Sequence, residues 1–212
     1  MLGVICAMEV ELSGLIALME NKEKVNIIGY EFTKGEIFGK KLVVALCGIG
    51  KANAAAVTAL LISNFGVSEL INLGVCGGSI GTGKTIVATS VVQYDFDTTA
   101  IGDELGKLDG FDSPYIKTSD ISDGIACDAR GVIASGDRFV SDKATVDFLT
   151  THFGAIGFDM ESGAVAQICT KANVKFAILR VVSDGGDIGE YVNFKELAAK
   201  KGIDAVLNYL NN

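Results

Sequence analysis

Short apolar segments rich in β-branched residues recur along the chain, and most are followed by a stretch with helical spacing. The strand-like segments are LGVICA (2–7), LINLGVCGG (70–78), TIVATSVVQYDF (85–96), GVIASG (131–136), AIGFDM (155–160) and FAILRVVSD (176–184). The helical stretches are 9–20, 48–65, 140–153, 161–172 and 194–210. Buried strands that alternate with helices are typical of a sheet covered on both faces. We therefore predict an α/β fold, a three-layer sandwich in which a mixed, mostly parallel central sheet is flanked by helices.

Two segments depart from this alternation. Residues 27–38 and 40–48 are strand-like and meet at Gly39-Lys40, which predicts an antiparallel hairpin near the N-terminus. Residues 98–130 are the least regular part of the chain and contain its only proline. We interpret this stretch as an excursion from the sheet, because 212 residues suit one domain. The expectation is a single domain over residues 1–212.

The charge balance argues against a nucleic-acid partner. The chain has 18 Lys and Arg against 26 Asp and Glu, a net charge of −8, and only three arginines, Arg130, Arg138 and Arg180. Neutralising many phosphates requires clustered basic side chains. No apolar run approaches the roughly 18 residues of a membrane helix, and the N-terminus lacks the basic region of a secretory signal. We expect a cytoplasmic protein that binds neither nucleic acid nor a membrane.

The cysteines and the histidine do not form a metal-binding pattern. The five cysteines contain no CxxC pair and lie mostly in apolar runs, which favours buried free thiols in a reducing compartment. The single histidine, His152, falls in a polar stretch and is interpreted as a surface residue. We expect neither a metal nor another cofactor, so that any catalysis depends on carboxylates.

One motif offers an alternative function. Residues 78–85, GSIGTGKT, satisfy the GxxxxGK[ST] phosphate-loop pattern, in which Lys84 and Thr85 would hold phosphates. A phosphate loop opens a helix whose N-terminus faces the phosphates. Here the β-branched sequence IVATSVV follows Thr85 and predicts a strand. We therefore favour a glycine-rich loop between two strands and keep a nucleotide-binding protein as the alternative of a different class.

Acidic residues follow three strand-like segments that are far apart in the sequence. Glu11 lies one turn after the first segment, Asp159 and Glu161 flank Met160, and Asp184 ends the last strand-like segment. The ends of strands in an α/β sheet gather at one edge, where ligands bind. A single such carboxylate is more often a helix cap or a solvated loop residue. The set of three predicts a cleft.

These residues resemble the nucleoside phosphorylase/nucleosidase superfamily, and most of all its methylthioadenosine/S-adenosylhomocysteine nucleosidases. Six segments match in family order across nearly the whole chain, namely AMEVE (7–11), GIGK (48–51), INLGVCGG (71–78), SGDRF (135–139), DME (159–161) and RVVSD (180–184). The resemblance implies hydrolysis of the N-glycosidic bond of a purine nucleoside, releasing adenine and a 5-thioribose. A phosphorolytic purine nucleoside phosphorylase is the close alternative.

The resemblance assigns the two catalytic roles by position. Asp184 matches the general acid that protonates N7 of the departing purine, and Glu11 matches the carboxylate that activates the attacking water. Breaking an N-riboside passes through an oxocarbenium-like state, which independently calls for one acid and one carboxylate beside the water. A phosphorolytic site would instead need arginines that converge on a dianion. In phosphorylase relatives, the resemblance places the phosphate ligands in the segments that match 7–11 and 48–51. No arginine of this chain falls in either segment, so we predict that water attacks the sugar.

The remaining roles are those of substrate-binding residues. The resemblance implies that Glu161 holds the ribose hydroxyls, with Met160 beside the sugar, and that Phe139 stacks on the purine. The expected contacts around these are Val140 beside the adenine, Ser183 and Arg180 orienting the acid's loop, Met8, Ile49 and Phe194 lining the sugar and its 5′ substituent, and Val75 and Gly77 in the matched strand end.

The chain departs from the family pattern at three of its positions. Val75 stands where the family usually has serine, and Ile101 and Asp109 stand where it places a larger apolar residue and a proline. In the family this excursion comes from the neighbouring subunit and helps to cover the 5′ group. We therefore expect a homodimer, with the departures bearing on which 5′ substituent is accepted more than on the reaction.

Overall fold

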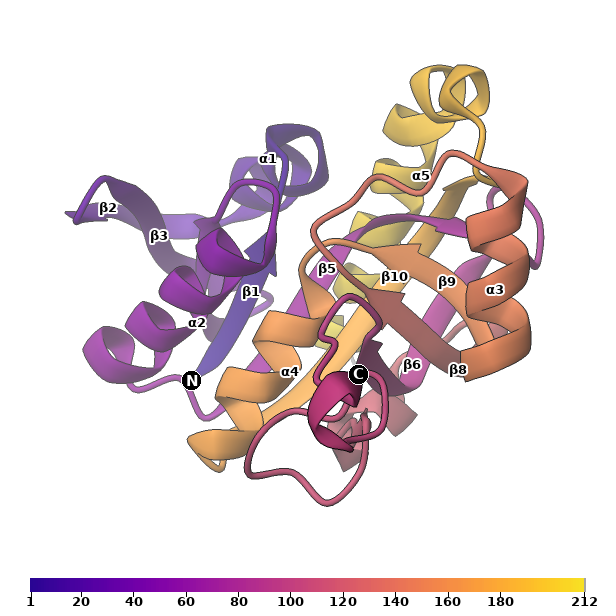
Figure 1. Cartoon of the computed structure of the whole chain (residues 1–212). Helices are drawn as coiled ribbons and strands as arrows, with labels where there is room; N and C mark the ends of the chain where they lie inside the picture. The colour runs from indigo at the N-terminus through magenta and orange to yellow at the C-terminus, as the bar shows by residue number, and fades with distance from the viewer. Residues whose placement is uncertain (212) are drawn as a thin grey trace.

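The computed structural model describes residues 1–211. The chain alternates strands and helices, as Figure 1 shows. The elements are β1 (Leu2–Cys6), α1 (Glu9–Leu18), β2 (Glu20–Ile27), β3 (Tyr30–Ile37), β4 (Lys40–Leu46), α2 (Lys51–Phe65), β5 (Glu69–Gly78), β6 (Thr85–Gln93), the 3₁₀ helix η1 (Thr99–Ile101), β7 (Tyr115–Lys117), the 3₁₀ helix η2 (Asp120–Gly124), β8 (Ala129–Ser135), α3 (Lys143–Phe153), β9 (Ala155–Asp159), α4 (Ser162–Lys171), β10 (Lys175–Asp184) and α5 (Ile188–Asn211).

The central strands are buried on both faces, which explains why they read as continuous apolar runs. In β1, Ile5 packs into a core with α2 and α4, whereas Val4 and Cys6 face a second core with α1 and α5. Helix α2 packs against α4, and α1 packs against α5. The predicted α/β fold, with helices on both sides of a mixed sheet, is confirmed.

The prediction of a mostly parallel sheet is wrong. Within residues 1–211, five strand pairings are parallel and five are antiparallel. The strand order is β10-β6-β8-β9-β5-β1-β4-β3-β2, and β10 also pairs with β5. The strands β5, β10, β6, β8 and β9 therefore form a closed five-stranded barrel, and the sheet is not an open middle layer.

The short connection between β5 and β6 explains why β6 runs antiparallel to its neighbour β10. Six residues, 79–84, join β5 to β6, and a parallel crossover needs about a dozen or more. Strand β6 consequently runs antiparallel to β10, which is itself parallel to β5. The barrel closes where β9 pairs with the last residues of β5, Gly77 with Phe158 and Gly78 with Gly157.

The N-terminal hairpin is one part of a larger unit. Strands β3 and β4 pair as predicted, and β2 adds a third antiparallel strand that the sequence did not reveal. Five consecutive residues of β2, from Glu20 to Lys24, are exposed and mostly charged, so they lack the apolar alternation of a buried strand. Charged side chains of this kind protect an edge strand from pairing with other chains.

Two other segments differ in detail from the sequence prediction. The excursion over 98–130 contains β7 and the two short 3₁₀ helices, and β7 pairs with β6. Helix α5 begins at Ile188, whereas the helical pattern was predicted from residue 194. Within residues 1–211, no helix combines the length and apolar character needed to cross a membrane.

The phosphate-loop motif connects two strands. Strand β5 ends at Gly78 and β6 begins at Thr85, so the loop between them leads into a strand and does not open a helix. The Thr85 N–H donates to Asp128 Oδ2 at 2.8 Å, and Lys84 Nζ lies 3.5 Å from the other oxygen of that carboxylate. These contacts agree with the interpretation of the motif as a glycine-rich loop.

Replacing Lys84 with Ala should change neither stability nor ATP binding. The lysine side chain is 53% exposed, and Asp128 keeps a second partner in Lys201 at 3.0 Å. Surface pairs of this kind contribute about 0–1 kcal/mol. Urea unfolding and ATP titration of both proteins check this, and a loss of measurable ATP binding in the variant would restore the phosphate-loop hypothesis.

Candidate active site

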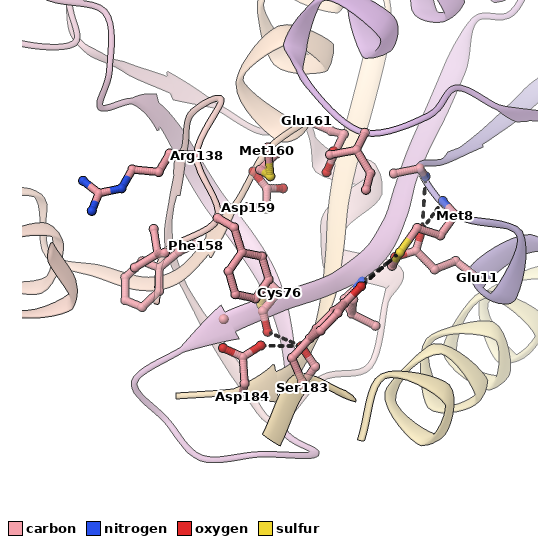
Figure 2. Close-up of a pocket in the computed structure, with 17 residues that line it drawn as sticks. Met8, Glu11, Cys76, Arg138, Phe158, Asp159, Met160, Glu161, Ser183 and Asp184 are labelled. Atoms are coloured by element: carbon pink, nitrogen blue, oxygen red, sulfur yellow. Dashed lines mark hydrogen bonds between the residues drawn. The ribbon is translucent and has the colours of Figure 1, made fainter. Parts of the chain in front are cut away.

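An open cavity, about 570 Å³ when the solvent at its mouth is included, lies where strands of the barrel and β1 end. Figure 2 shows carboxylates on opposite sides of it, with Asp184 on one side and Glu11 and Glu161 on the other. The lining residues are Ala7, Met8, Glu11, Ile49, Val75, Cys76, Gly77, Arg138, Phe139, Val140, Phe158, Asp159, Met160, Glu161, Ser183, Asp184 and Tyr191.

Glu11 is held by three backbone donors. Its Oε2 accepts from the N–H groups of Ala7 and Met8 at 3.0 and 2.9 Å, and its Oε1 accepts from the Val75 N–H at 2.9 Å. The first two bonds satisfy amides at the start of α1, where helix N–H groups lack partners. The side chain is buried, and this burial raises the pKa of Glu11 above its ordinary value. Glu11 is therefore rigidly placed and a stronger base than a solvated glutamate.

A glycine allows this approach of Glu11 to β5. A Cβ atom at Gly74 would lie 3.1 Å from Glu11 Oε1 and 3.4 Å from the guanidinium carbon of Arg180. Any larger residue would push on both side chains. Gly74 in the INLGV segment thus leaves the space that Glu11 and Arg180 occupy beside β5.

Asp184 is buried at the end of β10. Its Oδ1 accepts from the Gly186 N–H at 2.9 Å, and its Oδ2 lies 2.8 Å from the Ser183 hydroxyl. That hydroxyl is also 3.1 Å from the carbonyl oxygen of Cys76 on β5. Serine and the following turn therefore fix the orientation of the Asp184 carboxylate (Figure 2).

Glu161 lies between β9 and α4. Its Oε1 accepts from the Gly50 N–H at 2.9 Å, which ties it to the turn before α2. Burial, and secondly the nearby Asp159 carboxylate, raise the pKa of Glu161 to about 7. Near neutral pH this carboxyl group is therefore partly protonated.

Behind the cavity, Arg180 organises the carboxylate cluster. The guanidinium is 1% exposed, and its Nε donates to Asp159 Oδ2 at 2.8 Å. Its terminal nitrogens donate to the carbonyl and side-chain oxygens of Asn72 and to the Ser162 hydroxyl. Asp159 also accepts from the Ser162 hydroxyl. This network joins β10, β5, β9 and α4.

The structure brings eleven of the thirteen predicted site residues to the cavity wall. The two others lie elsewhere. Arg180 contacts Asp159 and Asn72 from behind the wall. The resemblance predicted that Arg180 orients the loop of Asp184, but within residues 1–211 it makes no hydrogen bond to that loop. Phe194 lines a separate surface groove with Thr82, Gly83 and Leu197. The early start of α5 places Tyr191, three residues before Phe194, in the cavity instead.

Several wall residues were not predicted from the sequence. Tyr191, Phe158, Cys76 and Ala7 were not singled out, and Arg138 and Asp159 were noted without a binding role. Phe158 and Cys76 directly adjoin residues that were predicted, so proximity along a strand end was the available signal. Tyr191 had no such signal, because its position depends on where α5 begins. Within residues 1–211, no group of three or more His, Cys, Asp or Glu side chains is arranged to hold a metal ion.

The fold and this site define a class of protein. The sequence profile of the Phosphorylase superfamily matches residues 1–211, and the chain belongs to that superfamily. Within it, the chain belongs with the 5′-methylthioadenosine/S-adenosylhomocysteine nucleosidases. It is 34% identical over 227 aligned residues to such a nucleosidase from Geobacillus sp. (strain WCH70), and the match covers 100% of this chain and 98% of the relative.

Solved structures agree with that assignment. The Neisseria meningitidis 5′-methylthioadenosine/S-adenosylhomocysteine nucleosidase in complex with methylthio-immucillin-A is similar with a TM-score of 0.95 and 31% identity, over 99% of this chain and 97% of that one. The futalosine hydrolase of Helicobacter pylori strain 26695 is similar with a TM-score of 0.93 and 29% identity, over 99% and 97%. The fold is thus shared with a methylthioadenosine/S-adenosylhomocysteine nucleosidase and with a futalosine hydrolase.

Replacing Arg180 with Met should destabilise the protein strongly. The substitution leaves the Asp159 charge buried without its guanidinium partner, which typically costs about 3–5 kcal/mol. Arg138→Met is the control, because its pair with Asp142 is exposed and should contribute less than about 1 kcal/mol. Urea unfolding measures both, and equal stabilities of the two variants would contradict this account of the network.

The raised pKa of Glu161 predicts how stability depends on pH. A carboxyl group whose pKa rises on folding, here from 4.5 to about 7, stabilises the fold below its unfolded pKa and loses this contribution as pH rises to 7. Relative to Glu161→Gln, the unmodified protein should therefore lose free energy of unfolding between pH 4.5 and 7. Urea denaturation of both proteins across this pH range checks the prediction. If the unmodified protein gains free energy of unfolding relative to Glu161→Gln as the pH rises, the pKa of Glu161 is not raised.

Proposed function

We propose that this chain hydrolyses the N-glycosidic bond of a purine nucleoside, 5′-methylthioadenosine or S-adenosylhomocysteine, and releases adenine and a 5-thioribose. The observation that carries the proposal is the pair of buried carboxylates that face one cavity, Glu11 from the first turn of α1 and Asp184 from the end of β10. The membership in a nucleosidase family supports the same reaction. We propose that residues 1–212 act as one domain.

Asp184 acts as the general acid. The purine leaves readily only when N7 gains a proton, and a positioned acid typically contributes about 10²–10⁴-fold in rate. The Gly186 N–H and the Ser183 hydroxyl fix the two oxygens of Asp184 and thereby aim the group at one place in the cavity. Phe158 and Val140 lie on the cavity wall and limit access of water there.

Glu11 manages the attacking water. An ionised carboxylate offers about four acceptor positions, and three backbone N–H groups occupy three of them on Glu11. Because Glu11 lines the cavity, we assign the remaining position to a hydrogen bond from the attacking water. Because the pKa of Glu11 is raised by burial, the group also accepts the water's proton more readily than a solvated glutamate.

The other wall residues bind the substrate. Glu161, anchored by the Gly50 N–H, receives the ribose hydroxyls, and Met160 packs beside the sugar. Phe139 and Val140 contact the purine. The remaining proposed contacts are Met8 and Ile49 at the sugar and its 5′ substituent, and Val75, Gly77 and Ser183 at the strand ends, with Arg180 acting through Asp159.

Phosphorolysis is disfavoured by the partners of the arginines. The guanidinium N–H groups of Arg180 already donate to protein acceptors behind the cavity wall. Arg138 pairs with Asp142 at 2.8 Å, and Arg130 donates to backbone carbonyl groups. A dianion beside Glu11 and Glu161 would also meet two carboxylates. The acidic cavity therefore disfavours a bound phosphate dianion, and a neutral water molecule is the nucleophile that we propose.

We propose that the protein works in the cytoplasm, in methionine salvage, where methylthioadenosine is recycled. All five cysteines are free and four are buried, as suits a reducing compartment. The substrate is a small purine nucleoside, and we propose no partner of nucleic acid or membrane.

A homodimer is proposed from the apolar groups near the cavity mouth and on the excursion. Ile101 on the excursion is 80% exposed, and Ile49 on the cavity wall is 53% exposed, so both are available to contact a second copy of the chain. Light scattering should give twice the chain mass, and Ile101→Asp should reduce that mass. A single-chain mass with full activity would contradict the dimer.

Replacing Asp184 with Asn should abolish nearly all turnover while preserving nucleoside binding. Asparagine keeps the shape of the side chain but has no acidic proton to transfer to N7, so kcat for adenine release from methylthioadenosine should fall by about 10²–10⁴-fold. The control is Asp123→Asn, whose side chain is 85% exposed. A kcat for Asp184→Asn within tenfold of that of the control variant would contradict the proposal that Asp184 is the general acid.

A further inference from the structure

Tyr191 connects two sides of the cavity. Its ring meets Phe139 edge to face, with centroids 5.3 Å apart, and its hydroxyl donates to Met8 Sδ at 3.3 Å. Met8 belongs to the turn before α1, whereas Tyr191 lies near the start of α5. The phenol thus reaches the part of the wall where Met8 is proposed to face the sugar and its 5′ group.

The Tyr191 hydroxyl is a donor with a weak partner. A thioether sulfur is a poor acceptor, so this bond exchanges easily for a better one. The other side-chain donors of the wall are engaged, because Ser183 lies against Asp184 and Arg138 pairs with Asp142. Burial raises the pKa of Tyr191, and the carboxylates of Glu11, Asp184 and Glu161 add to this effect, so the hydroxyl keeps its proton.

Lys195 places a cation beside this donor. It lies one helical turn after Tyr191 on α5, and its Nζ is 5.5 Å from the centre of the Tyr191 ring. The side chain is half-buried, and among residues 1–211 no carboxylate oxygen comes within ion-pair distance of it. A cation and a hydroxyl donor together are suited to a carboxylate.

We propose that Tyr191 and Lys195 form a subsite for a carboxylate at the end of the substrate's 5′ substituent. This inference rests on the proposed function and specifies its substrate class. S-adenosylhomocysteine carries such a carboxylate, and methylthioadenosine ends in a methyl group. The interior of the cavity holds Glu11, Asp159, Glu161 and Asp184, which repel the carboxylate of this zwitterionic tail and attract its ammonium group, so the carboxylate is directed outward, toward Lys195. Tyr191 then exchanges Met8 Sδ for a carboxylate oxygen.

The test compares kcat/KM for the two substrates in Tyr191→Phe and Lys195→Met. Hydrogen bonds to charged groups exceed those to neutral ones, so the ratio of S-adenosylhomocysteine to methylthioadenosine should fall about tenfold or more in Tyr191→Phe. It should fall about two- to fivefold in Lys195→Met, and Lys195→Arg should restore it. Added salt should lower the ratio in the unmodified protein but not in Lys195→Met.

Matched controls lie on the same helix. Tyr209→Phe and Lys200→Met make the same chemical changes away from the cavity, and both should keep the ratio of the unmodified protein. Equal losses on both substrates in Tyr191→Phe, or an unchanged ratio in both site variants, would overturn the subsite. Absence of methylthioadenosine turnover in the unmodified protein would instead contradict the proposed function itself.

Discussion

The buried guanidinium of Arg180 is the interaction on which the site depends. It links Asn72 on β5, Asp159 at the end of β9 and Ser162 on α4 from its own position in β10. Its positive charge also opposes the burial that raises the pKa values of Glu11 and Glu161. Without it, several acidic groups could not remain together in a poorly hydrated cavity. The same residue therefore holds the barrel strands together and makes the acidic cavity possible.

Closure of the barrel gives this cluster its geometry. Strands β5 and β10 run in parallel and end together, which brings Val75, Gly77 and Asp184 to one edge. The β5–β9 pairing adds Asp159, and the turn after β9 adds Glu161. Glu11 joins them from α1 through the Val75 N–H. The acid of the proposed reaction thus ends strand β10, and the base lies in the first turn of α1 and is tied to strand β5 by the Val75 N–H, so that the neighbouring strands β5 and β10 fix the positions of both groups.

The sequence predicted the strand ends well because each central strand is buried on both faces and reads as an apolar run. It failed at β2, whose exposed charged residues resemble a loop. It also missed closure of the barrel, because the β9 contact with β5 involves only two residue pairs and leaves no periodic signal. Carboxylates at strand ends were predictable by position. Tyr191 was not, since six additional residues at the start of α5 decide whether it or Phe194 faces the cavity.

The central claim is that water attacks the sugar, and product analysis tests it most directly. Methylthioadenosine is incubated with the protein in phosphate-free buffer and in buffer with increasing phosphate, and the sugar product is identified by mass spectrometry. The account predicts the same rate of adenine release in both buffers and free methylthioribose as the sugar product. A rate that rises in proportion to phosphate, with a sugar 1-phosphate as product, would contradict it.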